Sequence, residues 1–248
     1  MSRQPRVLSR RSTNACALVL TALFLADNFA VDARQGSEAA MEGKPRSPAE
    51  TAERWGISVA TMARVEALGQ QVDTTYQGWV RSRDRAALEK SIKLQAAIVE
   101  LAPKSWEMQA SLANLYYYGG DDATAEIHAR QAVLLNAGVA TTQKLLGRIL
   151  VQIGRSQEGL PHLQEALALA PHDGECWHKV GTVLFEQGLM QGAVTCFRAA
   201  GALRNDSLSW LSAAHTLHKL QKRGEAYKLY HASIRADAAN HDAWQDFA

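Results

Sequence analysis

The amino-acid sequence predicts an all-α fold built from stacked antiparallel helix pairs. Beyond residue 50, apolar residues recur at spacings of three and four, and no long segment alternates apolar and polar residues. Gly, Asn or Asp interrupts this pattern about every 12–18 residues, which favours helices joined by short turns. Small and large residues also recur at a period of 34, as Leu112-Ala113, Leu146-Gly147 and Val180-Gly181 show. Such a period indicates helical repeats, which stack because one pair cannot bury its apolar face alone.

The first 33 residues are predicted to be a targeting segment. Residues 1–11 carry four Arg and no acid, and an apolar stretch follows at 15–26. A basic region before roughly a dozen apolar residues is typical of a secretory signal peptide, and the stretch is short for a membrane-spanning helix. We therefore expect an extracytoplasmic protein, periplasmic or secreted. An uncleaved membrane anchor and a mitochondrial presequence remain alternatives.

Composition and charge exclude several classes of function. The chain has 248 residues, of which 47% are hydrophobic, and a net charge of +2. Removal of residues 1–33, which hold four Arg and two Asp, takes 27 basic and 25 acidic residues to 23 of each. A neutral mature chain gives no support to a role in nucleic-acid binding. Membrane association is expected only if the N-terminal segment is uncleaved.

Residues 34–47 are polar and rich in small side chains, which predicts a flexible linker. Ser47, Pro48 and Glu50 then predict a helix start, because Ser caps the first backbone N–H groups, Pro suits the first helical position and Glu completes a capping box.

Residues 48–105 are expected to hold extra N-terminal helices. Within them, residues 72–105 form a possible degenerate repeat. Pro103 sits at the correct position, but Gly78 and Ser91 do not support the core positions of a regular unit.

Repeat units in a common register follow from residue 106. A small residue on the first helix, such as Gly147, is expected to meet a small residue on the second, such as Gly159. Large residues such as Trp177 and Phe197 fill the space between units. The predicted units are 106–139, 140–173, 174–206 and 207–240, with a partial unit at 241–248.

These positions resemble the tetratricopeptide repeat (TPR) family, whose pattern runs Trp, Leu-Gly, Tyr, Ala, Phe, Ala and Pro. The resemblance covers about two thirds of the chain. In the unit 106–139, Ala129 stands where an aromatic residue is expected. The resemblance implies a right-handed superhelix, a TPR solenoid of about four repeats. The best match lies in 174–206, through Trp177, Gly181, Leu184, Ala193, Phe197 and Ala200.

The resemblance also implies a function. First helices of the family line a concave groove that binds peptides or partner helices without catalysis. We therefore expect an adaptor or assembly factor. Basic and aromatic side chains predominate at the groove positions, which favours an acidic or C-terminal peptide segment as ligand. The predicted groove residues are Asn114, Tyr117, Lys144, Arg148, His178, Lys179, Phe185, His215, His218 and Lys219.

Catalytic and cofactor motifs are not found. The sequence contains no HExxH, CxxC, nucleotide-binding glycine loop or GxSxG motif, so we expect neither an enzyme nor a cofactor. His215 and His218, three residues apart, are the one starting point for a metal site, with His231 or His241 as a third ligand. We expect most histidines to lie at the surface and hold no metal.

Two further alternatives stay open. Trp244 begins an unfinished unit at 241–248, so the C-terminal end could dock on a second copy as a self-associating scaffold or homodimer. Cys176 and Cys196 are expected to pack as buried thiols, although an oxidising compartment would allow a disulfide between them.

Overall fold

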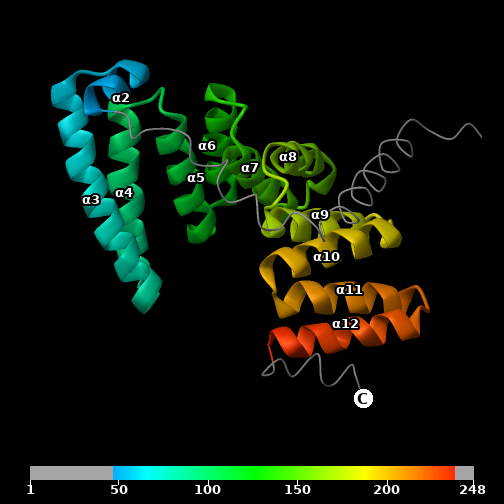
Figure 1. Cartoon of the computed structure of the whole chain (residues 1–248). Helices are drawn as coiled ribbons and strands as arrows, with labels where there is room; N and C mark the ends of the chain where they lie inside the picture. The colour runs from blue at the N-terminus through cyan, green and yellow to red at the C-terminus, as the bar shows by residue number, and fades with distance from the viewer. Residues whose placement is uncertain (1–46, 238–248) are drawn as a thin grey trace, which may run out of the picture. The chain divides into compact units, whose positions relative to one another are not determined.

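The computed structural model describes residues 47–237, which form eleven helices and no strand (Figure 1). The predicted all-α fold of helix pairs is confirmed. The described residues fall into two compact units, the N-terminal unit (residues 47–171) and the C-terminal unit (residues 172–237). The predicted signal peptide at 1–33, nearly all of the linker at 34–47 and the partial unit at 241–248 lie outside the described residues.

Short turns join consecutive helices into antiparallel pairs (Figure 1). Not one of these eleven helices combines the length and the apolar character needed to cross a bilayer. In the N-terminal unit the helices are α2 (Pro48–Trp55), α3 (Val59–Ser82), α4 (Arg85–Leu101), α5 (Trp106–Gly119), α6 (Asp122–Leu135), α7 (Ala140–Gln152) and α8 (Ser156–Leu169). In the C-terminal unit they are α9 (Gly174–Glu186), α10 (Met190–Arg204), α11 (Ser207–Lys219) and α12 (Arg223–Ala236).

The helix start predicted at residue 48 is confirmed. Glu50 N–H donates to Ser47 Oγ at 3.2 Å, and Ser47 N–H donates to Glu50 Oε2 at 2.8 Å. This reciprocal capping box satisfies two of the backbone donors that a helix start leaves without partners. Pro48 occupies the first helical position, and α2 ends at Gly56, whose φ of 68° favours glycine.

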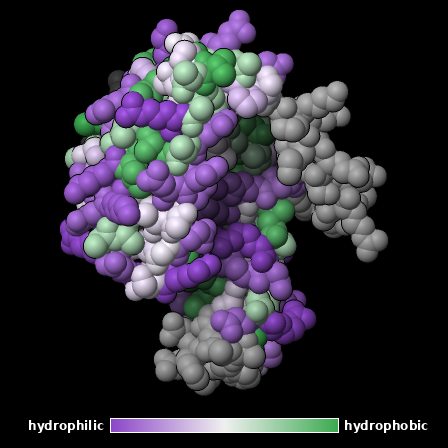
Figure 2. All heavy atoms as spheres, turned by 90° about the vertical axis from the view of Figure 1, so that its left-hand side faces the viewer, coloured by the Kyte–Doolittle hydropathy of each residue, from purple (hydrophilic) through white to green (hydrophobic). Residues whose placement is uncertain are grey.

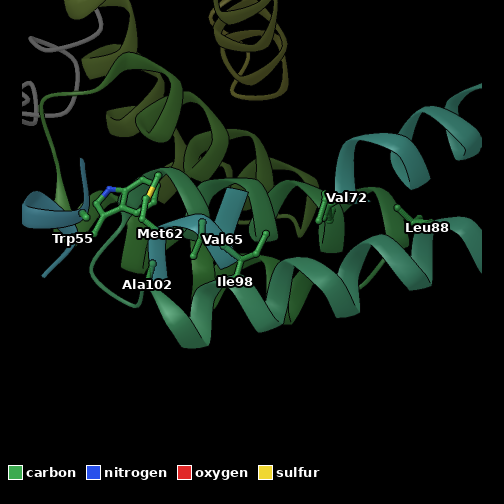
Figure 3. Packing of buried hydrophobic residues seen from close by; sticks show 9 residues of the cluster. Trp55, Met62, Val65, Val72, Leu88, Ile98 and Ala102 are labelled. Atoms are coloured by element: carbon green, nitrogen blue, oxygen red, sulfur yellow. The ribbon is translucent and has the colours of Figure 1, made fainter. Parts of the chain in front are cut away.

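Helices α2, α3 and α4 share one hydrophobic cluster. Trp55 of α2 lies beside Met62 of α3, and Val65 of α3 packs near Ile98 of α4 (Figure 3). Ile98 is 1% exposed, and burying a side chain of this size contributes roughly 1.5–3 kcal/mol. The extra N-terminal helices therefore belong to the folded core of the N-terminal unit.

The predicted contact between small residues explains how closely α7 and α8 approach. A methyl group added at Gly147 would lie 2.7 Å from Leu163 Cγ and 3.0 Å from the carbonyl oxygen of Gly159. A methyl group at Gly159 would lie 2.8 Å from the carbonyl oxygen of Gly147. Neither position has room for a side chain, because the two backbones are in contact there.

The contact between α3 and α4 follows a different register. By the 34-residue period, Trp79 stands at the position of Ala113, where a small residue would face the second helix. Instead, the hydroxyl of fully buried Ser91 donates to Thr75 Oγ1 at 2.7 Å, one helical turn before Trp79. The close approach is thus shifted by one turn, and Trp79 is a partly buried residue that packs against the hydrophobic cluster of this unit.

Two units replace the expected Trp by a buried Gln, which the repeat pattern did not predict. Gln143 Nε2 donates to the carbonyl oxygen of Ala137 at 2.9 Å, and its Oε1 lies 2.8 Å from His162 Nδ1. The pair Gln109 and His128 repeats this arrangement, also at 2.8 Å. Because the amide nitrogen donates to a carbonyl, its oxygen accepts, and each histidine carries its proton on Nδ1. Burial lowers the pKa of both histidines.

A four-membered charge network links α6 with the start of α8. Arg155 Nη1 lies 2.8 Å from Glu126 Oε1, and Arg130 Nε lies 2.7 Å from the same oxygen. Both arginines also contact Glu158, whose pKa is lowered by their hydrogen bonds. Networks of this kind cost less side-chain entropy per contact than isolated surface pairs, although salt screens them.

Large aromatic residues are buried in the C-terminal unit. Trp177, Phe197 and Tyr230 are each 4% exposed. Cys176 and Cys196 are both buried free thiols, and burial raises the pKa of Cys196 to about 12.

Candidate functional site

Helix α7, the first helix of the predicted unit 140–173, supplies two cations on one face. Lys144 and Arg148 are four residues apart, so they lie one above the other. Gly147 faces α8, and the next residue along the helix, Arg148, turns toward α5. The sequence of α7 contains no acid, and this face is therefore positively charged.

Side chains of α5 fix the position of Arg148. Its Nη2 donates to Asn114 Oδ1 at 2.8 Å, and its guanidinium carbon lies 4.5 Å from the ring centroid of Tyr117. Asn114 and Arg148 are 34 residues apart, so they occupy equivalent positions on neighbouring first helices. A guanidinium stacked on an aromatic ring and hydrogen-bonded by an amide is held in one orientation before any ligand arrives.

Asn114 and Arg148 line a groove of about 330 Å³ between α5 and α7. Two lining residues are cationic and none is Asp or Glu. Four more, including Asn114, offer uncharged hydrogen-bonding groups. The groove is thus suited to an anionic side chain or another small anionic group. Its lining residues are Ala110, Ser111, Asn114, Tyr118, Thr141, Lys144, Leu145 and Arg148.

Aromatic rings continue from this groove onto α3. The Trp79 indole lies 5.5 Å from the ring of Tyr118 and 5.3 Å from the ring of Tyr76, centroid to centroid. Arg83, which ends α3, places its guanidinium carbon 4.9 Å from the Trp79 ring centroid. Burial raises the pKa of Tyr76, as does Tyr118, whereas Arg83 and Arg148 lower it. Both arginines therefore act on the same group of rings.

Sequence reasoning found part of this site and missed the rest. The structure brings together four predicted residues, Asn114, Tyr117, Lys144 and Arg148, on adjacent helices. It adds Trp79 from α3, which the repeat pattern assigned to a poorly matching unit. The mismatch itself was the signal, because a Trp at a position that elsewhere holds Gly or Ala cannot fit between two close helices.

The other predicted residues lie in the C-terminal unit. Lys219 Nζ lies 4.4 Å from the ring centroid of Phe185, so these two residues contact each other. His178 Nδ1 lies 2.9 Å from Ser209 Oγ, and its ring packs 5.2 Å from that of Phe197. His178 thus contributes to the packing of its unit, and its role in binding stays a prediction.

Lys179 and the histidines of α11 complete the predicted set. Lys179 is partly buried on α9, and His215 and His218 are exposed on α11. The ring of His215 contacts Tyr230 edge-on at 5.8 Å. Within residues 47–237, no three His, Cys, Asp or Glu side chains form a group that could hold a metal ion. His241, the other ligand considered, lies outside the described residues.

The surface offers no simpler candidate on the face drawn in Figure 2. Hydrophilic residues cover most of the described surface there, and hydrophobic residues form small patches between them. That face has no broad apolar area of the kind that marks a protein interface. The candidate site is the mixed basic and aromatic cluster of α3, α5 and α7, where two cations, an amide and aromatic rings lie together.

Comparisons with known proteins agree on the fold. The chain is similar to MamA (18% identity, TM-score 0.59, covering 65% of this chain and 95% of MamA). It is also similar to YrrB, a TPR protein with an unusual peptide-binding site (17% identity, TM-score 0.56, covering 71% and 98%). A third similar structure is TTC0263, a thermophilic TPR protein of Thermus thermophilus (15% identity, TM-score 0.57, covering 73% and 96%). No protein-family model and no curated protein matches the sequence. At these identities the likeness shows the fold alone, and that is the TPR fold.

Proposed function

We propose that this chain is a non-catalytic binding module that holds an acidic segment of a partner protein in the basic groove between α5 and α7. One observation carries the proposal. Lys144 and Arg148 project together into a groove whose lining includes no Asp or Glu, and Arg148 is oriented by Asn114 and Tyr117.

The geometry supports an acidic ligand on energetic grounds. A carboxylate that accepts from a guanidinium forms a charge-assisted hydrogen bond worth about 1.5–3 kcal/mol. Arg148 is already held in place, so a ligand spends little entropy on ordering it. Lys144, a more flexible point charge one turn away, would strengthen the attraction at longer range.

The similar structures support a binding role. YrrB is described as a TPR protein with a peptide-binding site, and several of the similar proteins are TPR proteins. The fold is suited to this task because paired helices present a preformed, extended surface. The proposed role is that of an adaptor or assembly factor. Binding of a ligand by Lys179, Phe185 and Lys219 within the C-terminal unit stays a separate prediction.

We also propose that the protein acts outside the cytoplasm. The support is the basic and then apolar pattern of residues 1–33. Cell fractionation combined with N-terminal sequencing of the mature protein tests this location. A chain recovered from the cytoplasm with residues 1–33 intact would contradict it.

The binding test compares two charge-matched variants of residues 34–248. In Lys144→Ala/Arg148→Ala the groove loses both cations. In the control Lys90→Ala/Lys93→Ala, two exposed lysines of α4 are removed instead. Proteins retained on each immobilised form are quantified by mass spectrometry, and overlapping peptides of the retained partner are then tested for direct binding.

We expect to find a partner that both the wild type and the α4 control retain. The groove variant should retain at least about tenfold less of it, since the loss of one charge-assisted hydrogen bond already weakens binding by that factor. We also expect the binding peptides to be acidic. Equal retention by both variants, with unchanged circular dichroism, would show that the groove is not the site.

A further inference from the structure

The candidate site extends well beyond the groove itself. Starting at Arg148, the rings of Tyr117 and Tyr118 come first, then Trp79, and finally the guanidinium of Arg83. All of these residues belong to the N-terminal unit. The result is a row of aromatic rings with a cation at each end.

The shifted register of α3 and α4 is what makes this row. Thr75, rather than Trp79, meets Ser91 in the close contact between the two helices. The Trp79 indole therefore packs against Tyr118, which is itself 42% exposed. The planes of Trp79 and Tyr118 are inclined by 43°, so the rings form an angled surface rather than a flat stack.

The helical scaffold limits the form of an extended ligand. Backbone N–H and C=O groups of α3, α5 and α7 are used within the helices, so the site has no strand edge to pair with a β-strand. An extended ligand must bind through its side chains and accept hydrogen bonds from side-chain donors. A polyproline II segment meets this requirement, because it has no internal hydrogen bonds and its conformation is preformed. Aromatic-lined grooves are the usual binding surface for such segments.

Distances in the row set the spacing of the ligand. The Trp79 and Tyr118 centroids are 5.5 Å apart, and Arg148 Cζ lies 6.0 Å from the Tyr118 centroid. The indole is therefore at most about 11.5 Å from the guanidinium. Polyproline II rises about 3.1 Å per residue, so this span corresponds to at most about three to four residues.

We propose that the ligand is an acidic, proline-containing segment in the polyproline II conformation. A prolyl ring packs on Trp79 and Tyr118, and an Asp or Glu no more than about four residues away reaches Arg148 and Lys144. This inference rests on the proposed function, because it assigns the ligand class of the same site.

Matched peptides of about 12 residues, long enough for several polyproline turns, test this assignment by fluorescence anisotropy with residues 34–248. The parent peptide carries two adjacent prolines and a glutamate pair three residues away. One derivative replaces both prolines by alanine, a second replaces both glutamates by glutamine, and a third separates the two groups by a flexible glycine-serine spacer.

Protein variants identify the contacting residues. Trp79→Leu removes the indole, while Trp79→Phe retains a ring and reports on whether the fold tolerates a change there. Tyr227→Leu, at an exposed tyrosine of α12 in the C-terminal unit, is the matched control. Circular dichroism spectra and melting temperatures confirm that each variant is folded.

We expect the parent peptide to bind at least about tenfold more tightly than each of the three derivatives. Trp79→Leu should abolish the preference for proline over alanine, whereas Trp79→Phe and Tyr227→Leu should retain it. Binding that depends on glutamate and on Arg148, but is the same for proline and alanine peptides, would overturn this inference and leave the proposed function standing. Binding that depends on neither glutamate nor Arg148 would overturn both.

Discussion

Replacing Gly147 by Ala tests the close helix contact on which the repeat architecture depends. The added methyl group would lie 2.7 Å from Leu163 Cγ and 3.0 Å from the carbonyl oxygen of Gly159. The leucine side chain can rotate only into a filled core, and the carbonyl oxygen belongs to the backbone of α8. The two helices must therefore separate.

The size of the effect follows from two opposing contributions. Overpacking of a filled core costs about 1–3 kcal/mol, and the backbone contact places this substitution in the upper half of that range. Ala also stabilises a helix interior by roughly 0.5–1 kcal/mol relative to Gly. The net result for Gly147→Ala is a loss of about 1–2.5 kcal/mol, which lowers the melting temperature by roughly 3–8 °C for a chain of this size.

Gly78→Ala is the matched control for this substitution. Gly78 is also inside a helix, but a methyl group there would meet nothing within 4 Å. Only the propensity gain remains, and the melting temperature should rise by roughly 2 °C. Thermal denaturation followed by circular dichroism measures both variants. A Gly147→Ala variant that is as stable as wild type, or more stable, would refute the close packing of α7 on α8.

Three other properties follow from the same structure. Burial lowers the pKa of His128 and His162 from 6.5, so the unfolded chain binds more protons than the folded chain below that pH. The free energy of unfolding, measured in urea, should therefore be highest above about pH 6.5 and fall as the pH drops toward the lowered pKa values. The fall should be shallower in a variant in which both histidines are replaced by Gln. A fall of equal steepness in that variant would assign the effect to other groups. Cys176 and Cys196 should react with a thiol reagent only as fast as the protein unfolds, and rapid labelling of the native protein would show that they are accessible. Glu158→Gln should lower the melting temperature at low ionic strength and leave it unchanged in about 1 M NaCl, where charges are screened within roughly 3 Å. If the melting temperature is still lowered in salt, packing rather than charge explains the contribution of the network to stability.

Local sequence rules predicted the features that depend on neighbouring residues. The capping box requires only Ser47 and Glu50, three residues apart, and it forms as expected. The turn after α5 likewise depends on Gly120, whose φ is 80°, and on Asp121, which caps α6. The 34-residue period identified the contact between Gly147 and Gly159 because both positions recur in every unit.

The repeat pattern did not predict features that depend on a residue far away in the sequence. Trp79 is one example, because the packing of two helices determines that Thr75 rather than Trp79 meets Ser91. The available signal was that Trp79 stands where the other units have Gly or Ala. The burial of Gln143 was not predicted, since its partners are a turn carbonyl and a histidine 19 residues away. Its recurrence as Gln109 with His128 was the available signal, because both pairs keep the same separation.

Photo-crosslinking in the intact cell tests the groove most directly. Benzoyl-phenylalanine is placed at Tyr118, which lines the groove, or at Tyr227, an exposed tyrosine of α12. Binding in the groove predicts that the probe at Tyr118 captures an acidic segment of a partner protein, that Lys144→Ala/Arg148→Ala abolishes this capture, and that the probe at Tyr227 does not capture the same segment. Capture that survives the loss of both cations, or that occurs only from Tyr227, would contradict binding in the groove between α5 and α7.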